Sequence, residues 1–506
     1  MKYFVRSLFA TLVLGPLASL ASFAQDVVEV DAAKVLRTFD RNPIGINVNH
    51  LMDADSKRPA GSRPLTSALK DLGVGNLRFP EGELGDSYLW AVPPFPVQSA
   101  ARPQWALRGP GFWPSQDVRF STADYQPRPD VMGFDAFLDL VKATRAAPVI
   151  IVAYDSAYKK IGGAAARPAL PDLIASAAAW VHYANVTKGQ AIRYWEIGNE
   201  SDIVPEAHSG GDPGAKQYAE DVVAFARAMK AEDPAIKIGI NVWQNKRLAE
   251  LLDFPELWSH VDFVSLHNYP TYGWKNGYET FRSRKHDFAA SIQEAETLLQ
   301  QSSLSAEDKK RIEFLVTETS PIDWAKTDKW PNVADHGHAL VMFDMIGQTL
   351  LQPRVTQLHQ WVTRWIHNDE AGPLKVYDAL APDNQLTSMG NVLGLWGRHI
   401  GQQLVSATGS EMIQAYASAS PAAGRLAVFL LNKDTRPHRI RLKVDNVSAP
   451  RVESIRCFSA TTPEASSSSL NELPASGLSL EGVELPPLSI TVLTLGVHYS
   501  AGASSP

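Results

Sequence analysis

Short apolar runs alternate with amphipathic segments along most of the chain. The runs are rich in β-branched residues and are continuous rather than alternating, which is typical of strands buried on both faces. Eight of them lie at Ile44–Val48, Gly75–Phe79, Val149–Ala153, Ile192–Ile197, Ile236–Asn241, Val261–Leu266, Phe314–Thr317 and Val355–Trp361. The segments between them repeat their apolar residues with a helical period, as Tyr218, Val222, Phe225 and Met229 do.

Eight strand-then-helix units predict parallel strands joined by right-handed crossovers and closed into a (β/α)8 barrel. The predicted barrel domain covers residues 43–404. An open, doubly wound sheet is the alternative, and the count of eight disfavours it. The fold class is therefore α/β, with a second domain of a different kind after the barrel.

The pattern changes near residue 405, where short strand-like runs follow one another without a helical period. Three of these runs are Arg425–Leu431, Arg439–Val444 and Leu488–Leu495. They predict an all-β sandwich domain over residues 405–498. Residues 25–42, with Val27–Val30 and Val35–Phe39, are expected to add strands to it. The tail at residues 499–506 is predicted to be disordered.

The N-terminus has the pattern of a targeting segment. Lys2 and Arg6 precede an apolar stretch from Leu8 to Leu20, and small residues, Ser22 and Ala24, flank Phe23. This predicts a signal peptide at residues 1–24 that is cleaved after Ala24, and bacterial export to the periplasm or the medium. The apolar core is too short for a spanning helix. An uncleaved anchor is the alternative.

Composition narrows the class of partner. The chain is 45% hydrophobic, enough for a large core, and Lys+Arg (48) nearly balance Asp+Glu (54) at a net charge of −6. Without a long basic run, neither nucleic acid nor a membrane surface is predicted as a partner. The one cysteine, Cys457, excludes an internal disulfide. No phosphate loop, nucleophile elbow or dinucleotide fingerprint stands out, so no cofactor is predicted.

Aromatic residues are concentrated in two long stretches that follow predicted strands. The stretch from Pro80 to Asp130 follows the second strand, and another, with Tyr272, Trp274 and Tyr278, follows the sixth. Loops after barrel strands line the face where barrel active sites lie. Because sugar rings stack on aromatic faces, these loops are interpreted as walls of a sugar-binding groove. A structural lid without sugar contacts is the alternative.

Two glutamates follow apolar strands where packing does not require a carboxylate. Glu200 ends Tyr194-Trp195-Glu196-Ile197-Gly198-Asn199-Glu200 after the fourth strand, and Glu318 follows the seventh in Leu315-Val316-Thr317-Glu318. Strands four and seven face each other across a barrel mouth, so the carboxylates are expected to converge on one bond. A carboxyl separation of about 5–5.5 Å serves retaining glycosidases, and about 6.5–9.5 Å serves inverting ones.

The pattern Asn199-Glu200 after one strand, with Glu318 after another, resembles clan A of the glycoside hydrolases. Within the clan it is most similar to the α-L-arabinofuranosidases, the β-xylosidases and the heparanase-like β-glucuronidases. The resemblance implies a barrel plus a β-sandwich, Glu200 as acid/base and Glu318 as nucleophile of a retaining enzyme. It also implies that Asn199 hydrogen-bonds the hydroxyl next to the anomeric carbon.

Four more residues end predicted strands and are candidates for the substrate site. Arg78 ends strand two and is expected to hold the nucleophile ionised. His267 and Tyr269 end strand six, and in the arabinofuranosidase-like enzymes such a pair contacts the sugar and the nucleophile. Trp361 ends strand eight, where the clan often has an aromatic floor. In each case the alternative is a buried residue satisfied by its neighbours.

The chain departs from those families after strand two. They usually have a Gly-Gly-Asn type turn, and this chain has Pro80-Glu81-Gly82-Glu83-Leu84. Two acids there disfavour an acidic sugar and so argue against a glucuronidase. Both acids, Glu81 and Glu83, could instead bind hydroxyls of a neutral sugar, and Glu83 is the candidate for the substrate site. Solvated loop carboxylates are the alternative.

Two other acidic positions are given structural roles. Glu196 lies four residues before Glu200 in the same predicted strand, so both are expected to face one side, with Glu196 as a buried partner. Asp335-His336-Gly337-His338 lacks a third ligand at a recognisable spacing, so no metal is predicted and helix-cap and surface roles are favoured.

The leading functional hypothesis is a retaining glycosidase acting on an oligo- or polysaccharide, arabinofuranosidase-like or an endo-glycanase. A non-catalytic carbohydrate-binding protein on a hydrolase fold is the second hypothesis, and a secreted metalloenzyme is the third. The identity of the sugar, exo or endo action and the oligomeric state stay open.

Overall fold

The computed structural model describes residues 26–82, 85, 132–158, 169–202, 213–271, 273–274, 276–323, 330–365, 373–475 and 478–499. Several sequence-based predictions lie outside these residues: the signal peptide at 1–24, Glu83, Tyr272, most of the stretch from Pro80 to Asp130, and the tail after Tyr499. Tyr499 itself, placed in that tail by the sequence, is the last residue of a strand.

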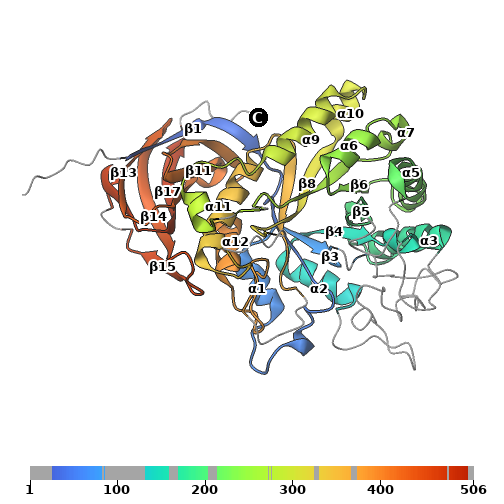
Figure 1. The fold of residues 1–506 in the computed structure, drawn as a ribbon, viewed down its shortest axis with the longest axis horizontal. Coiled ribbons are helices and arrows are strands. Elements are labelled where there is room, and N and C mark those ends of the chain that lie inside the picture. Colours follow the sequence, from blue (N-terminus) through green and yellow to red (C-terminus); the bar gives the residue numbers. More distant parts are fainter. Residues whose placement is uncertain are drawn as a thin grey trace, which may run out of the picture.

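Eight parallel strands close into a barrel, as the sequence predicts (Figure 1). Their order around the barrel is the order of the chain, and the first strand pairs with the last. The strands are β2 (Ile44–Asn47), β3 (Asn76–Phe79), β4 (Ala147–Val152), β5 (Tyr194–Ile197), β6 (Lys237–Val242), β7 (Phe263–Asn268), β8 (Glu313–Thr319) and β9 (Val355–Gln360). Each matches one predicted run within three residues at either end.

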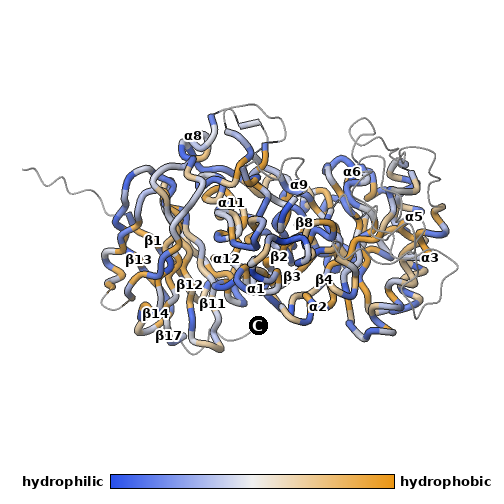
Figure 2. Tube along the Cα trace, turned by 90° about the horizontal axis from the view of Figure 1, so that it is seen from below, coloured by the Kyte–Doolittle hydropathy of each residue, from blue (hydrophilic) through white to orange (hydrophobic). Residues whose placement is uncertain are grey.

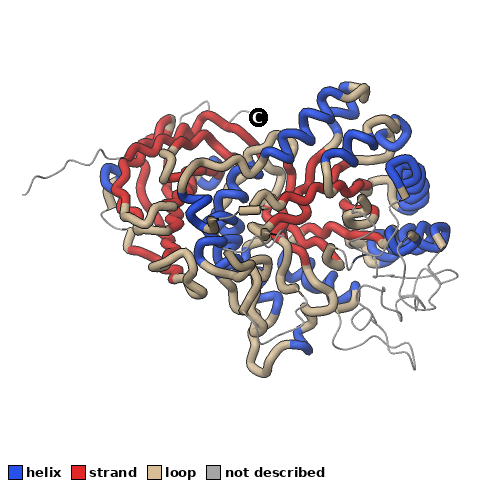
Figure 3. Tube along the Cα trace, in the orientation of Figure 1, coloured by secondary structure: helices blue, strands red, loops and turns tan. Residues whose placement is uncertain are grey.

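Helices lie between successive strands and surround the barrel (Figure 3). They are α1 (Leu65–Leu72), α2 (Phe134–Thr144), α3 (Leu170–Val181), α5 (Gly214–Glu232), α6 (Asn245–Leu251), α7 (Pro255–Trp258), α8 (Tyr278–Arg282), α9 (Ala290–Gln301), α10 (Ala306–Arg311), α11 (His336–Leu350) and α12 (Ser388–His399). In α5 the predicted apolar stripe, Tyr218, Val222, Phe225 and Met229, is buried against the strands. One π-helical segment, His182–Thr187, continues α3. Short 3-10 turns lie at Asp55–Lys57, Asp155–Ala157, Pro421–Ala423 and Leu480–Gly482.

The second domain is one mixed sheet of nine strands. They are β1 (Asp26–Thr38), β10 (Gln403–Thr408), β11 (Ile413–Ser420), β12 (Arg425–Asn432), β13 (His438–Asp445), β14 (Val447–Ser459), β15 (Ser469–Leu473), β16 (Val483–Leu485) and β17 (Ser489–Tyr499). The order is β15-β14-β17-β12-β11-β10-β1-β13-β16. The two N-terminal runs are one strand, β1, whose pairing with β10 shifts register between Asp31 and Val35.

The sheet curls around a core of its own. Ile455 of β14 and Val483 of β16, near opposite edges of the sheet, belong to one buried cluster. A single curled sheet thus encloses the apolar interior that two facing sheets enclose in a sandwich.

The other face of the sheet packs on the barrel domain. In β12, Leu426, Val428 and Leu430 point into the sheet's own core, whereas Ala427, Phe429 and Leu431 join the barrel's cluster. Phe429 stacks on Trp396 of α12 with ring centroids 4.2 Å apart. Burial of side chains of this size contributes about 1.5–3 kcal/mol each. Hydrophobic segments of the barrel strands, β11 and β12 accordingly lie in the interior (Figure 2).

The Asp335–His338 segment caps a helix, as predicted, but it is buried at this interface and does not lie on the predicted surface. The Asp335 carboxylate accepts from the His338 backbone N–H at the start of α11. His336 reaches across to the Ser468 hydroxyl and the Leu488 carbonyl of the second domain. Within the described parts of the chain, no helix is long and apolar enough to cross a membrane.

Candidate active site

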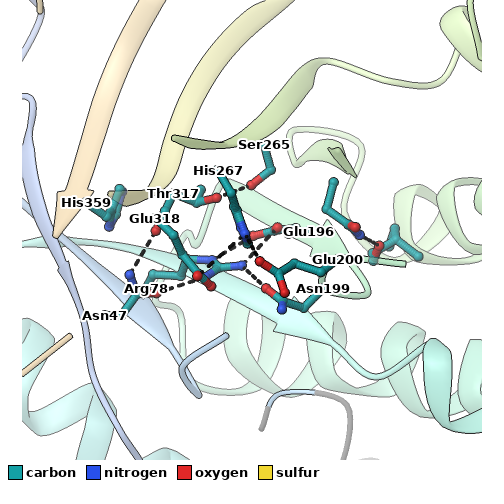
Figure 4. Close-up of polar contacts among 12 residues, drawn as sticks. Asn47, Arg78, Glu196, Asn199, Glu200, Ser265, His267, Thr317, Glu318 and His359 are labelled. Carbon is teal, nitrogen blue, oxygen red and sulfur yellow. Dashed lines mark hydrogen bonds and ion pairs between the residues drawn. The ribbon is translucent and has the colours of Figure 1, made fainter. Parts of the chain in front are cut away.

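The carboxyl ends of the barrel strands bring together seven of the eight predicted site residues. Arg78 lies in β3, His267 in β7 and Glu318 in β8, and each side chain points into the barrel mouth (Figure 4). The remaining four described residues lie just past strand ends: Asn199, Glu200, Tyr269 and Trp361. Glu83, the eighth, is outside the described residues.

Arg78 is the centre of the polar network and is fully buried. Its guanidinium donates Nε and Nη2 to the two oxygens of Glu196, at 2.9 and 3.0 Å. Nη1 donates to Oε1 of Glu318 at 2.9 Å, and Nη2 to Oδ1 of Asn199 at 2.6 Å. Burial opposes the charge of Arg78, but Glu196 and Glu318 outweigh it and raise the arginine pKa. Arg78 therefore holds Glu318 in place with a permanent charge.

Glu196 and Glu200 separate where β5 ends. The strand stops at Ile197, and Gly198 (φ 74°) and Glu200 (φ 51°) take left-handed conformations. The prediction that both carboxylates continue one strand and face one side is therefore wrong, because the alternation of side chains holds only in extended backbone. Glu196 stays buried on Arg78, as its predicted structural role requires, and Glu200 reaches His267 instead.

The turn after β5 is held by neighbouring strand ends. The Asp155 carboxylate accepts from the Asn199 N–H at 3.1 Å and the Ser201 hydroxyl at 3.0 Å. Asn241 of β6 accepts from the Ser201 N–H at 2.8 Å. A Cβ on Gly198 would lie 2.7 Å from Asp155, so the turn needs glycine both for its φ and for space. These contacts fix the direction in which Glu200 leaves the strand.

His267 lies between the two predicted catalytic carboxylates. Its Nδ1 is 2.7 Å from Oε1 of Glu200 and 3.5 Å from Oε2 of Glu318. One oxygen of each glutamate and a His267 ring nitrogen all lie within 4.8 Å of one another. Burial disfavours the charged imidazolium, but Glu318 and Glu200 together outweigh it and raise the pKa of His267.

Tyr269 is a neutral donor to Glu318. Its hydroxyl donates to Oε2 of Glu318 at 2.7 Å. Burial, and then the charge of Glu318, raise the pKa of Tyr269 well above its usual value, so the phenol keeps its proton. Both oxygens of Glu318 thus accept hydrogen bonds, one from Arg78 and one from Tyr269. Bonds of this kind favour an ionised carboxylate.

Trp361 forms an aromatic wall of the mouth and is anchored by Glu81. Its ring meets Tyr269 edge-on at 6.4 Å between centroids. Its indole N–H donates to Oε1 of Glu81 at 2.7 Å. Glu81 is fully buried, so this acid of the Pro80–Leu84 turn is not a solvated loop carboxylate, the alternative considered for the two acids.

Sequence reasoning did not find two polar residues of the mouth. Asn47 ends β2, accepts from Arg78 Nη1 at 2.9 Å and donates to the Thr317 carbonyl at 2.8 Å. His359 of β9 is buried, and burial together with the charge of Arg78 lowers its pKa to about 3. The available signals were an amide and an imidazole within two of the predicted strands, near their carboxyl ends.

Gly82 closes over the predicted nucleophile. A Cβ at this position would lie 2.2 Å from Oε1 of Glu318 and 3.4 Å from Oδ1 of Asn199. We expect Gly82→Ala to lower kcat/KM by about a hundredfold, because displacement of a reacting group by an ångström costs that much. Gly133→Ala is the matched control, since its Cβ would meet nothing within 4 Å. Equal kcat/KM for the two variants on an aryl glycoside would contradict this geometry.

Glu200, His267 and Glu318 lie close enough together to offer three ligand atoms to a metal ion. The donors around them argue against it. Arg78 and Tyr269 already direct protons at both oxygens of Glu318, and the guanidinium would repel a cation. The arrangement fits a proton-transfer pair better than a coordination site.

Comparisons with known proteins agree with this arrangement. The family model of the alpha-L-arabinofuranosidase 1 domain matches residues 68–290. The fold matches that of an alpha-L-arabinofuranosidase from Thermotoga maritima with a TM-score of 0.66. The match covers 93% of this chain and 99% of that one, at 16% sequence identity. A Paenibacillus polymyxa xyloglucanase from glycoside hydrolase family 44 matches with a TM-score of 0.57 at 13% identity, over 93% and 99% of the two chains.

The family 51 alpha-L-arabinofuranosidase AbfB from Bifidobacterium longum matches over 94% of this chain and 99% of its own, at 15% identity and a TM-score of 0.62. No curated protein sequence matches the chain. At such identities the structural matches show the fold. The family model matches less than half of the chain, so it shows that residues 68–290 are similar to an alpha-L-arabinofuranosidase domain.

Proposed function

We propose that this glycosidase hydrolyses O-glycosidic bonds of an oligo- or polysaccharide by double displacement, with Glu200 as acid/base and Glu318 as nucleophile. One observation carries the proposal: oxygens of the two glutamates lie within 4.8 Å of each other. Carboxyl groups of inverting enzymes stand about 6.5–9.5 Å apart to admit a water, and retaining pairs about 5–5.5 Å.

The surroundings assign the two roles. Glu318 accepts from Arg78 and Tyr269, which stabilises its ionised form as a nucleophile needs. Glu200 lies 2.7 Å from His267 Nδ1, a ring nitrogen that also approaches Glu318. Because two carboxyl groups this close do not ionise equally, the proposal gives the proton to Glu200.

In the first step Glu200 gives its proton to the leaving oxygen while Glu318 attacks the anomeric carbon. The glycosidic C–O bond breaks and a glycosyl ester of Glu318 forms. In the second step Glu200 takes a proton from water, the water oxygen attacks the anomeric carbon, and the ester bond breaks. Two inversions at one carbon retain its configuration.

An arabinofuranosyl substrate has the strongest support, because the matching family model is that of an alpha-L-arabinofuranosidase domain. An endo-acting alternative rests on the fold shared with a xyloglucanase. A non-catalytic sugar-binding role is disfavoured by the fixed carboxylate pair. We also propose export of the enzyme, supported by the pattern of residues 1–24; the N-terminal sequence of secreted protein should start at Gln25.

The test is a screen of aryl glycosides, including an aryl α-L-arabinofuranoside, and of arabinan, arabinoxylan and xyloglucan, with the first product followed by NMR. We expect retained configuration in that product. Glu200→Ala should keep activity on glycosides whose aryl group leaves easily. It should lose activity on glycosides whose leaving group needs protonation, since only these depend on the acid. An inverted first product would refute double displacement, and sugar binding without turnover would favour the non-catalytic alternative.

A further inference from the structure

A second cavity lies at the opposite end of the barrel, where the strands begin. It has a volume of about 510 Å³, within the range of small-ligand pockets. The first residues of several strands line it, among them Ala147 of β4, Tyr194 of β5, Lys237 of β6 and Glu313 of β8. The end of β1 and the start of its connection to β2, at residues 37–41, form another wall. No residue of the catalytic mouth takes part.

The charge of this cavity is opposite to that of the whole chain. Its cationic lining residues are Arg37, Arg41, Lys142, Arg145, Arg193 and Lys237. Its acidic lining residues are Asp40 and Glu313. The lining therefore carries an excess of four positive charges in a chain whose net charge is −6. A concave wall of one sign concentrates the field and attracts counter-ions.

Glu313, one of the two acids of the lining, already has partners within the protein. It forms an ion pair with Lys237 and accepts from the Tyr194 hydroxyl at 3.0 Å and the Thr356 hydroxyl at 3.3 Å. Its charge cancels that of Lys237 and is not available to the arginines. Asp40, exposed on the β1–β2 connection, is the remaining acid of the lining.

Backbone carbonyls, rather than carboxylates, hold two of the arginines, Arg37 and Arg41. Arg37 donates to the carbonyls of Gln352 and Val355 at 2.5 and 2.6 Å. Arg41 donates to the carbonyl of Arg145 at 3.2 Å. Within the described residues neither guanidinium has a carboxylate within 4.0 Å, and burial lowers the pKa of both. Carbonyls fix the direction of a guanidinium but leave its charge uncompensated.

The cations converge on Tyr194. Lys237 Nζ lies 5.1 Å from the centre of the tyrosine ring. The charges of Arg41 and Arg193 both act on the phenol. Arg193, next in the chain to Tyr194, is exposed and has no acidic partner among the described residues. Lys237 and Arg41 are held by Glu313 and by the Arg145 carbonyl, and Arg193 lies beside them in the lining of the cavity.

We propose that this cavity binds an oxyanion, a phosphate or carboxylate group, between Arg41, Arg193 and the ring of Tyr194. Guanidinium groups present paired N–H donors that match the oxygens of such a group. The two sources of this chemistry are free phosphate and the carboxylates of an acidic oligosaccharide. The ligand would anchor to the barrel at the end remote from hydrolysis, so its binding does not depend on the proposed catalytic roles.

The test is titration calorimetry of the full chain at constant ionic strength with inorganic phosphate and, separately, with a trigalacturonide. The variant Arg41→Gln/Arg193→Gln should bind the anion about tenfold more weakly, because it removes two partly exposed charge pairs between arginine and ligand. Glu313→Gln should bind more tightly, since it removes a negative charge but keeps an acceptor. The control Lys216→Gln/Lys246→Gln removes two equally exposed cations on α5 and α6 and should change nothing.

Binding of phosphate alone would identify a small-anion site, and binding of the trigalacturonide alone a site for acidic sugars. The proposal is overturned if neither binds to the wild-type chain, or if affinity is the same in the cavity variant and the lysine control. Circular dichroism of each variant shows whether it is folded.

Discussion

Glu318→Ala is expected to lower kcat on any accepted glycoside at least about a thousandfold, because it removes the carboxylate that attacks the anomeric carbon. Arg78 and Tyr269 both donate to Glu318, so the variant leaves two donors without an acceptor and a space at the reacting position. Fold should persist, since Glu318 is one buried side chain of a large core. Thermal unfolding followed by circular dichroism checks this.

Azide distinguishes the two predicted roles. In Glu318→Ala, azide should enter the vacated space and attack the anomeric carbon once, giving a glycosyl azide of inverted configuration. In Glu200→Ala with an easily leaving aryl group, the ester of Glu318 still forms, and azide attacks it to give the retained product. The same product from both variants would contradict the assignment of nucleophile and acid/base.

Glu313→Ala is the matched control for this experiment. Glu313 lies on the same strand as Glu318 but at its opposite end, where it pairs with Lys237. Its removal costs an ion pair and leaves the catalytic mouth intact. Activity lost equally in Glu313→Ala and Glu318→Ala would show that damage to the strand, and not loss of a nucleophile, explains the result.

Arg78→Met is expected to destabilise the protein by about 3–5 kcal/mol and to reduce activity strongly. The cost arises because Glu196 and Glu318 would stay buried without their cation. Urea unfolding measures the free energy, and kcat/KM on an aryl glycoside measures the activity. Unchanged stability would mean that the guanidinium is not the buried counter-charge described above.

A double variant separates stability from catalysis. Arg78→Met/Glu196→Gln removes the more deeply buried of the two uncompensated carboxylates, so we expect much of the lost stability to return. Activity should stay low, because Glu318 and Asn199 would still lack the donors of Arg78. Recovery of both properties together would reduce Arg78 to a structural residue.

The barrel could be predicted from the sequence because buried parallel strands require continuous apolar runs, and the helices between them require a 3.6-residue period. The same runs located the site. A polar residue at the end of such a run lies at the carboxyl edge, and Arg78, Glu200, His267 and Glu318 were found in this way. Asn47 obeys the same rule and was overlooked, since an amide at a strand end carries little chemistry by itself.

The tertiary structure alone decided how these residues meet. Arg78 contacts Glu196, 118 residues away in the chain, and Glu318, 240 residues away. Glu81 turned inward to Trp361, which no local pattern predicts. The left-handed turn at Gly198 separated Glu196 from Glu200, and β1 joined the sheet of the second domain beside β10 and β13. A sequence pattern records which face a residue prefers, whereas its partner depends on packing between segments far apart in the chain.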